Sequence, residues 1–546
     1  MTSLEFKTQV TTLIDDLKSV CATFGLGNDG NEFKIITQLF LFKFMNDKFE
    51  FEFKKANPKY NNNDWFTEIE KLSPSEYEML LLMLDVDTAK LMPQHLLAHL
   101  YQNQNAPDFA KYLDDTLNEI ALKNVDLFSV QTAGGEKVKL FDRVTEFVSD
   151  GRDEFAKAII NKLITCNFQP IFNEKFDFFA TIFEYLIKDY NNDSGGKYAE
   201  YYTPHAVAKI MASILAPVPV ENVTCYDPSA GSGTLLMNIA HALGEQNCTI
   251  YSQDISQKSS NLLRLNLILN NLIHSIPNVV QGNTILDPFH KEDNLLDENN
   301  TAQTLKKFDF IVSNPPFKLD FSDYRDQLAD KNNNDRFFAG VPKVPAKAKD
   351  KMSIYSLFLQ HIIFSLSPNG KAAVVVPTGF ITAQSGIDKK IRQHLVDNKM
   401  LAGVISMPSN IFATTGTNVS IIFIDKNNQE DVVLIDASSL GKTVKEGKNQ
   451  KTELTPEEEQ YIITSFLNKS AIDEFAMVAK YNELKEKNYS LSAGQYFDIK
   501  IEYSDISHQE YLDKMKSFQD NLDALFNESK VLENKIQNNL KGLKYE

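Results

Sequence analysis

From Val223 onward, short strand-like runs alternate with helical stretches, and this alternation limits the possible folds more than any other feature of the chain. The apolar runs are VTCYD, CTIYSQD, FDFIVS, KAAVVVP, AGVISM, TNVSIIFID and VVLID. Strands that alternate with helices form βαβ units, in which helices cover both faces of parallel strands. The sequence therefore predicts an α/β fold on a mostly parallel sheet.

In the regions before and after this alternating part, apolar residues recur at the spacing of a helix. Residues 1–170 read as all-helical, because Phe33, Ile36, Phe40 and Phe44 recur at the spacing of one helix face. The last 40 residues contain about four heptads, with a seam of Tyr511, Met515, Phe518, Leu522, Leu525, Ser529, Leu532 and Ile536. This seam suits either a partner helix or a hairpin packed on its own domain, and we expect a partner.

Bulk composition excludes several classes of protein. The 546-residue chain has a net charge of -17, so a surface that is basic throughout, as a general nucleic-acid platform would be, is excluded. Its four scattered cysteines show no metal or disulfide spacing, and the histidines show no ligand spacing. No apolar run approaches the ~20 residues of a membrane span, and the start lacks a secretory pattern. We expect a cytoplasmic protein without a membrane segment.

Three successive strand ends carry residues suited to one nucleoside-shaped ligand. The sequence DPSAGSG, residues 227–233, follows the first strand, and its small residues allow a sharp turn before a helix N-terminus. Asp254 ends the next strand, 21 residues past Gly233, where a carboxylate can accept both ribose hydroxyls. Asn283 follows the third strand and can meet an adenine edge. A dinucleotide and S-adenosylmethionine both fit this pattern.

The stretch DFIVSNPPF, residues 309–317, favours S-adenosylmethionine. Two prolines stiffen the loop after the strand. The side-chain oxygen of Asn314 and the carbonyl of Pro315 can accept both hydrogens of an exocyclic amino group and direct its lone pair at an electrophilic methyl. Phe317 offers a flat face on which a flipped base can stack.

The order of these motifs resembles the modification (methyltransferase) subunit of type I restriction–modification systems, which are gamma-class N6-adenine DNA methyltransferases. The resemblance rests on KYAEYYTPHAVAKIM, DPSAGSG, SQD, GNTILDP, NPPF, MPSNIFATTGTNVSIIFI and LSAGQYFD in the family's order. It implies a Rossmann-like, seven-stranded methyltransferase sheet. The expected domains are a helical N-terminal domain (1–170), an S-adenosylmethionine-dependent catalytic domain (171–480) and a helical partner-docking segment (481–546).

The resemblance also implies roles for individual residues. The implied methyl-transfer loop is Asn314, Pro315, Pro316 and Phe317, with Phe412 as the second aromatic that stacks on the target base. The implied cofactor ligands are Tyr202, Thr203, Pro204, Asp227, Ser229, Gly231, Gly233, Asp254 and Asn283, where Asn283 stands at the family's usual aspartate position against the adenine. No metal is expected.

By resemblance, the partners are double-stranded DNA with a flipped adenine, a specificity subunit shared by two modification subunits, and a restriction subunit. Two other functions suit the same loop: a self-sufficient DNA amino-methyltransferase, and a protein glutamine N-methyltransferase acting on a carboxamide nitrogen. The basic insert between Phe317 and Met352 is read as a phosphate-contacting loop or as a solvated, disordered one. Residues 427–461 are read as mostly solvated loop around GKT, which lacks the first glycine of a phosphate loop.

Overall fold

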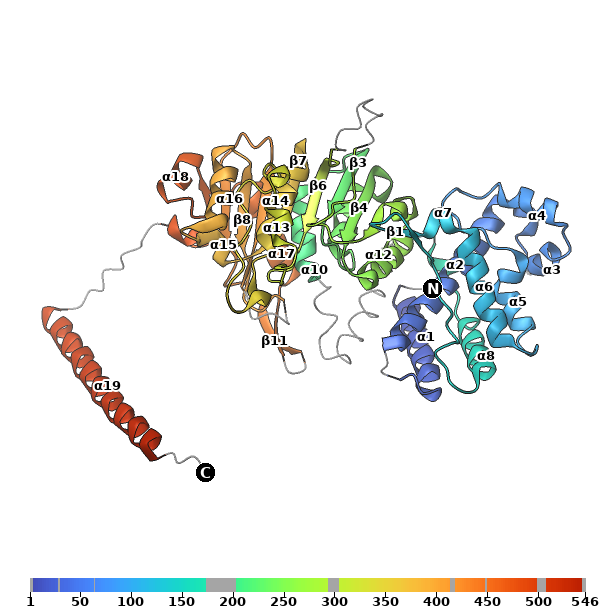
Figure 1. The fold of residues 1–546 in the computed structure, drawn as a ribbon, viewed down its shortest axis with the longest axis horizontal. Coiled ribbons are helices and arrows are strands. Elements are labelled where there is room, and N and C mark those ends of the chain that lie inside the picture. Colours follow the sequence, from blue (N-terminus) through green and yellow to red (C-terminus); the bar gives the residue numbers. More distant parts are fainter. Residues whose placement is uncertain are drawn as a thin grey trace. The chain divides into compact units, whose positions relative to one another are not determined.

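The computed structural model describes residues 3–27, 30–62, 64–172, 203–292, 304–412, 418–446, 449–497 and 507–542. The chain forms two compact units, Met1–Tyr496 and Phe497–Glu546. Among the described residues no helix is long and apolar enough to cross a bilayer. The first unit contains the sheet and the helices before it (Figure 1), and the second contains one long helix.

Helices dominate the first 170 residues, as the periodicity predicts. The longest is α2, which is buried around most of its circumference because its aromatic residues extend beyond a single face. The described α-helices are α1 (Ser3–Thr23), α2 (Gly30–Ala56), α3 (Trp65–Ile69), α4 (Pro74–Leu81), α5 (Leu97–Gln102), α6 (Phe109–Lys123), α7 (Val125–Phe128) and α8 (Arg152–Leu163).

One sheet of eleven strands runs through the first unit. All the strand-like runs named in the sequence are strands in it. The order is β13 (Ala476–Ala479), β10 (Val432–Asp436), β8 (Leu401–Ser406), β9 (Val419–Asp425), β7 (Leu366–Pro377), β6 (Phe308–Ser313), β3 (Val223–Asp227), β4 (Cys248–Asp254), β5 (Val279–Gln281), β1 (Val130–Thr132) and β2 (Lys137–Val138). Strand β9 is antiparallel to β7 and β8, β13 to β10, and β2 to β1, while the other pairs are parallel.

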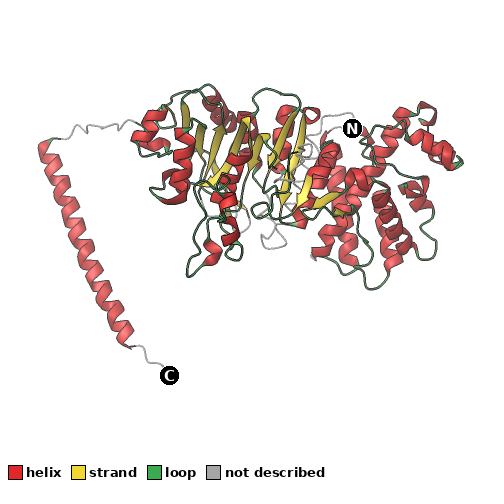
Figure 2. Cartoon of the chain, turned by 45° about the horizontal axis from the view of Figure 1, so that its top comes forward, coloured by secondary structure: helices red, strands yellow, loops and turns green. Residues whose placement is uncertain are grey.

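The expected α/β methyltransferase class is confirmed, and seven consecutive strands from β5 to β8 form its core. Two strands extend this core at each edge. Helices cover both faces of the sheet (Figure 2). The further helices of the first unit are α10 (His205–Leu215), α11 (Thr234–Leu243), α12 (Gln257–Leu269), α13 (Arg325–Leu328), α14 (Tyr355–Ser365), α15 (Gly379–Thr382), α16 (Gly386–Asp397), α17 (Pro456–Leu467) and α18 (Tyr481–Glu486).

The first 170 residues are not all-helical, because β1 and β2 join the edge of the sheet. Gln131 of β1 lies opposite Val280 of β5 in parallel register, and the N–H of Ala133 donates to the carbonyl of Gln281 (2.8 Å). Strand β1 thereby pairs the backbone groups that β5 would otherwise leave at an open edge. A three-residue strand shows too little alternation to be recognised in the sequence.

The side chain of Arg264 fastens this N-terminal segment to helix α12. Its buried guanidinium donates to the carbonyl oxygens of Val138 (3.2 Å) and Lys139 (3.0 Å), with longer contacts to those of Phe128 and Leu140 (3.4 Å each). The buried guanidinium thereby finds acceptors for its own N–H groups, which burial would otherwise leave unpaired.

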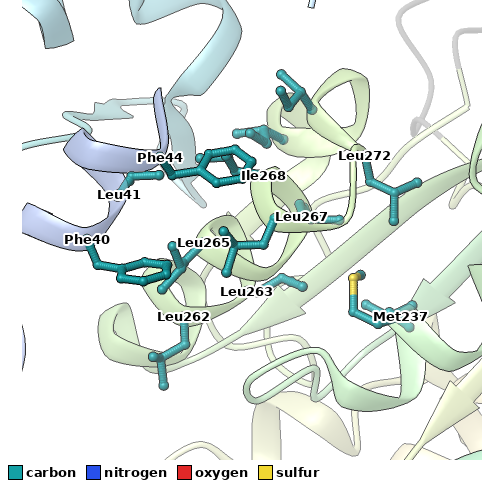
Figure 3. Close-up of a cluster of buried hydrophobic side chains, with 14 of the residues drawn as sticks. Phe40, Leu41, Phe44, Met237, Leu262, Leu263, Leu265, Leu267, Ile268 and Leu272 are labelled. Carbon is teal, nitrogen blue, oxygen red and sulfur yellow. The ribbon is translucent and has the colours of Figure 1, made fainter. Parts of the chain in front are cut away.

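Apolar packing joins α2 to α12 beside this polar contact. Figure 3 shows Phe40, Leu41 and Phe44 of α2 facing the leucine-rich helix α12. Their counterparts include Leu265 and Ile268, and all five side chains are at most 5 % exposed. Burial of this kind stabilises by about 25 cal/mol per Å² of apolar surface, so the helical region and the sheet share one core.

Residues 427–461 are not a mostly solvated loop. Strand β10 lies within them, and strands β11 (Lys442–Glu446) and β12 (Asn449–Glu453) pair as an antiparallel hairpin. Lys442 and Thr443, which resembled part of a phosphate loop, begin β11. The mixed charges of this segment led to the wrong prediction, because the hairpin is rich in charged residues and lacks the apolar alternation by which strands are recognised.

The second unit contains the helix α19 (His508–Gly542), which is continuous over 35 residues. The heptad region is therefore one straight element and does not form a hairpin within the described residues. All of its described side chains are exposed, including the large apolar seam residues Tyr511, Met515, Phe518, Leu522, Leu525, Leu532 and Ile536.

Candidate active site

The ends of β3 and β6 bring two of the predicted motifs together. These strands are parallel neighbours, with Tyr226 opposite Ile311. Asp227 ends β3 and Ser313 ends β6, and the hydroxyl of Ser313 donates to Oδ1 of Asp227 (3.0 Å). The Ser313 hydroxyl also lies 2.8 Å from that of Ser229. The glycine loop after β3 is thereby joined to the residue directly before Asn314.

Glycines permit the tight course of the loop between β3 and α11. Oδ1 of Asp227 accepts the N–H of Ser229 (2.9 Å), which starts the turn. Gly231 and Gly233 both have positive φ, of 53° and 84°. A Cβ on Gly233 would lie 2.2 Å from Cδ1 of the buried Leu263. Only glycine fits here without strain, and helix α11 begins at the next residue.

Asp254 supports the same loop from the end of the neighbouring strand β4. Its Oδ2 accepts the N–H of Gly231 (2.9 Å), and its Oδ1 accepts the N–H of Ser256 (2.8 Å). The side chain remains partly exposed. Each carboxylate oxygen has a second lone pair, so the group can hold the loop and still accept hydroxyl hydrogens from a ligand.

The loop after β5 is the third of the three strand ends, and the side chain of Asn283 stabilises the turn there. Oδ1 of Asn283 accepts the N–H groups of Ile285 and Leu286, each at 3.1 Å, so both lone pairs of this oxygen bond to backbone. The hydroxyl of Thr284 donates to the carbonyl of Pro228 (2.7 Å). Asn283 thus stabilises the loop, and a hydrogen bond from an adenine to its oxygen would compete with these two.

Thr203 and Asn314 meet across the sheet although 111 positions separate them. Nδ2 of Asn314 lies 3.4 Å from Oγ1 of the buried Thr203, and Pro204 directly follows Thr203 before helix α10. This contact uses the amide nitrogen and leaves the amide oxygen of Asn314 as an acceptor. Tyr202 lies outside the described residues.

A small cleft brings together five of the predicted site residues: Thr203, Asp227, Ser229, Gly231 and Asn314. Its lining is Thr203, Asp227, Ser229, Ala230, Gly231, Ser232, Thr234, Leu235 and Asn314. In the loop that follows Asn314, Pro315 is buried, Pro316 is exposed and Phe317 is half-buried. The ring of Phe317 meets Tyr355 edge-on, with centroids 6.3 Å apart.

Phe412 is also half-buried and lies in the loop after β8. The hairpin β11–β12 holds this loop, because Thr452 donates its N–H to the carbonyl of Asn410 (3.0 Å) and its hydroxyl to the carbonyl of Ser409 (2.7 Å). Among the ring contacts of the described residues, none joins Phe412 to Phe317. Residues 413–417, which follow Phe412, lie outside the described part of the chain.

Two neighbouring carboxyl groups give the cleft acidic character. Burial raises the pKa of Asp227 to about 7, against the lowering effect of hydrogen bonds from Ser229 and Ser313, and the charge of Asp254 raises it further. Burial also raises the pKa of Asp254. Neither group forms an ion pair with a cationic side chain in the described residues. A cationic ligand would favour the ionised form of both.

Three positions with clear structural roles were not identified from the sequence: Ser313, Thr284 and Thr452. Each is a small hydroxyl residue whose partner is distant in the sequence. Ser313 offered the strongest signal, since a polar residue ends an otherwise apolar strand directly before Asn314. Within the described residues no group of three or more His, Cys, Asp or Glu side chains is placed to hold a metal ion.

The chain is similar in sequence to proteins of one kind. The model of the N-6 DNA methylase family matches residues 174–505. The type I restriction enzyme MpnII methylase subunit of Mycoplasma pneumoniae is 26% identical over 464 residues, covering 83% of this chain and 80% of that protein. The MjaIX methylase subunit of Methanocaldococcus jannaschii is 27% identical over 402 residues, covering 70% and 66% respectively.

A solved structure shares the fold. The type I restriction-modification system methyltransferase subunit from Streptococcus thermophilus superposes with a TM-score of 0.69. It is 22% identical in sequence, and the match covers 91% of this chain and 100% of that one.

Proposed function

The chain belongs to the N-6 DNA methylase family, and from this premise we propose that it transfers a methyl group from S-adenosylmethionine to the N6 amino group of adenine in DNA. We further propose that it does so as the modification subunit of a type I restriction–modification complex, as its relatives are named. The main support is the placement of Asn314 in one cleft with the glycine loop that starts at Asp227.

The surroundings of the cleft suit S-adenosylmethionine in charge, and the glycine loop allows a close approach to the backbone. The two carboxyl groups of Asp227 and Asp254 lack a cationic partner among the described residues, and the ligand carries a sulfonium and an ammonium group. The loop around Gly231 and Gly233 places backbone rather than side chains next to the cleft. Thr203, Pro204 and the glycine loop would hold the methionine part, Asp254 the ribose hydroxyls, and the loop of Asn283 the adenine. Tyr202 is proposed for the methionine part on the family resemblance alone.

Asn314 would act by orienting the target amino group. The ligand supplies an electrophilic methyl. The amino nitrogen of adenine is a weak nucleophile because its lone pair is delocalised into the ring. The amide oxygen of Asn314 and the carbonyl of Pro315 would accept its two hydrogens and so favour a pyramidal nitrogen with its lone pair directed at the methyl. The contact between the amide nitrogen of Asn314 and Thr203 is compatible with this task, because it leaves the amide oxygen without a partner from Thr203.

Phe317 and Phe412 would hold the base after it leaves the duplex. Both rings are half-buried, so each retains exposed surface. Stacking of a base on an aromatic ring contributes about 1–3 kcal/mol, which offsets part of the cost of unstacking the target adenine. Pro315 and Pro316 would keep Phe317 in a fixed direction relative to Asn314.

Helix α19 is the proposed docking element for the specificity subunit. Its apolar seam residues are about half exposed, for example Phe518 at 60 %, Leu525 at 62 % and Ile536 at 58 %. A 35-residue helix with an apolar seam and charged flanks suits pairing with a helix of another protein. Two modification subunits would share one specificity subunit, and a restriction subunit would complete the complex.

Tritium transfer from labelled S-adenosylmethionine to DNA tests the proposal. The purified chain is assayed alone and with a specificity subunit from the same organism, and the DNA is then digested for nucleoside analysis. We expect N6-methyladenine only in the presence of the partner. Label from the chain alone would identify a self-sufficient enzyme. No label on DNA in either mixture would refute the proposal, and label on added protein would identify a carboxamide methyltransferase instead.

A further inference from the structure

The insert between Phe317 and Tyr355 is an ordered part of the first unit with a small core of its own. This core includes Phe321, Leu328 and Phe337, each at most 4 % exposed. It packs against Ile285, Met352, Ile354, Leu357 and Phe358. The alternative of a solvated, disordered loop is therefore wrong for this segment. The sequence did not reveal its core because the apolar residues lie far apart among polar ones.

Arg336 anchors the insert to the loop proposed to meet the cofactor adenine. The guanidinium is 5 % exposed and donates to the carbonyl oxygens of Thr284 and Ile285, each at 2.8 Å. Its Nε donates to Nδ1 of His361 (3.0 Å). Three hydrogen bonds from one buried cation fix the insert relative to the candidate active site.

Hydrogen bonds hold the residues on either side of a basic stretch in this insert. We name residues 343–351 the lysine arm. At its start, Nε of Arg325 donates to the carbonyl of Pro342 (3.2 Å). At its end, the N–H of Leu319 donates to the carbonyl of Met352 (3.1 Å). Leu319 is the second residue after Phe317, so the arm returns to the loop that carries the proposed methyl-transfer residues.

The lysine arm has a charge opposite to that of the whole chain. Four lysines and one aspartate give it a net charge of +3, whereas the chain has -17. Lys343, Lys347, Lys349 and Lys351 are all exposed. None of the four forms an ion pair in the part of the chain that the structure describes, although many other lysines do. Four exposed ammonium groups on an anchored segment form a surface suited to a polyanion.

We propose that the lysine arm contacts the sugar–phosphate backbone of duplex DNA beside the adenine that is methylated. This inference rests on the proposed function, since it places DNA at Asn314. A duplex bound there must pass close to the segment joined to Leu319. Ammonium groups that neutralise phosphates release condensed counterions, which favours binding at low salt. The arm thereby supplies a local excess of positive charge on a protein that is acidic as a whole.

Salt-dependent DNA binding tests the inference. Fluorescence anisotropy of a labelled duplex containing the recognition site is measured with the modification–specificity complex over a series of salt concentrations. The test variant is K347Q/K349Q/K351Q. Its matched control is K399Q/K469Q/K480Q, which removes three exposed or half-exposed lysines at the edge of the sheet where β8 and β10 begin, opposite to the end of β6.

We expect the test variant to lower the slope of log K against log salt by about 0.9 for each phosphate that the arm no longer neutralises, thus by up to about 3. The control should keep the wild-type slope. A wild-type slope in the test variant would overturn the inference. Failure of that variant to assemble with the specificity subunit would also overturn it, because the arm would then face protein. Methyl transfer by the wild-type complex is measured in parallel, and its absence would refute the proposed function itself.

Discussion

The hydroxyl of Ser313 donates to the carboxylate of Asp227 at 3.0 Å and so joins the ends of two neighbouring strands. Asp227 begins the glycine loop and Ser313 precedes Asn314, so this contact joins the loop proposed to bind the cofactor to the loop proposed to orient the target base. It also explains why both motifs follow strands: parallel strands end at the same edge of a sheet, where their loops converge.

Substitution of Asn314 should separate catalysis from cofactor binding. Asn314→Ala should lower the rate of methyl transfer by at least about a hundredfold, because one of two acceptors for the amino group is removed. The affinity for S-adenosylmethionine, measured by calorimetry, should stay within a few-fold of wild type. Asn369→Ala is the control, since Asn369 lies near the start of β7, at the end of the strands opposite to Asn314. A variant at Asn314 that still methylates at the wild-type rate would refute the role.

Asp254→Ala should weaken S-adenosylmethionine binding by at least about tenfold, since it removes the acceptor for the ribose and for the N–H of Gly231. Asp309→Asn is the matched control. Asp309 is a partly buried carboxylate bonded to Thr224 at the other end of the same sheet. Calorimetry should show unchanged cofactor affinity for the control. An unchanged affinity of Asp254→Ala for S-adenosylmethionine would show that Asp254 does not bind the ribose.

Cofactor affinity should depend on pH through Asp227. Burial raises the pKa of this carboxyl to about 7. A bound cation favours the carboxylate, so binding below about pH 7 should release a proton, and affinity should fall as the pH drops through this value. Calorimetry in two buffers of different ionisation enthalpy measures the released proton. Asp227→Asn should reduce this release, because only Asp254 then remains to lose a proton, and a wild-type protein that releases none would contradict the prediction.

Gly233→Ala should destabilise the first unit by about 2–4 kcal/mol, because the residue has a φ of +84° and its Cβ would meet Leu263 at 2.2 Å. Urea unfolding followed by circular dichroism measures the change. Gly379→Ala provides the control, since a Cβ there meets nothing within 4 Å. Equal stability of the two variants would show that the loop relaxes without cost.

Removal of residues 505–546 should abolish binding to the specificity subunit and leave the first unit folded. The two units are compact separately, so the thermal midpoint of the first should not change. Leu525→Asp in the full chain tests the seam without truncation, and Lys530→Gln on the same helix controls for the same change of -1 in net charge. Co-purification of the truncated chain at full stoichiometry would reject α19 as the docking element.

The sequence by itself determined most strands of the large sheet, the order of the motifs and the helical character of the C-terminal heptads. Buried parallel strands are nearly continuous apolar runs that end at polar loops, so VTCYD, CTIYSQD and FDFIVS could be recognised individually. The heptad period of α19 likewise repeats over enough residues to be unambiguous. In each of these cases the signal lies within one contiguous segment.

Only the tertiary structure decided how these segments meet. The addition of β1 to β5, the bond from Asn314 to Thr203 and the anchoring of the insert by Arg336 each join residues far apart in the chain. Hydrogen bonds of this kind depend on one or two atoms of a distant partner. They leave no periodic pattern in the sequence, because only the folded chain brings those atoms within reach.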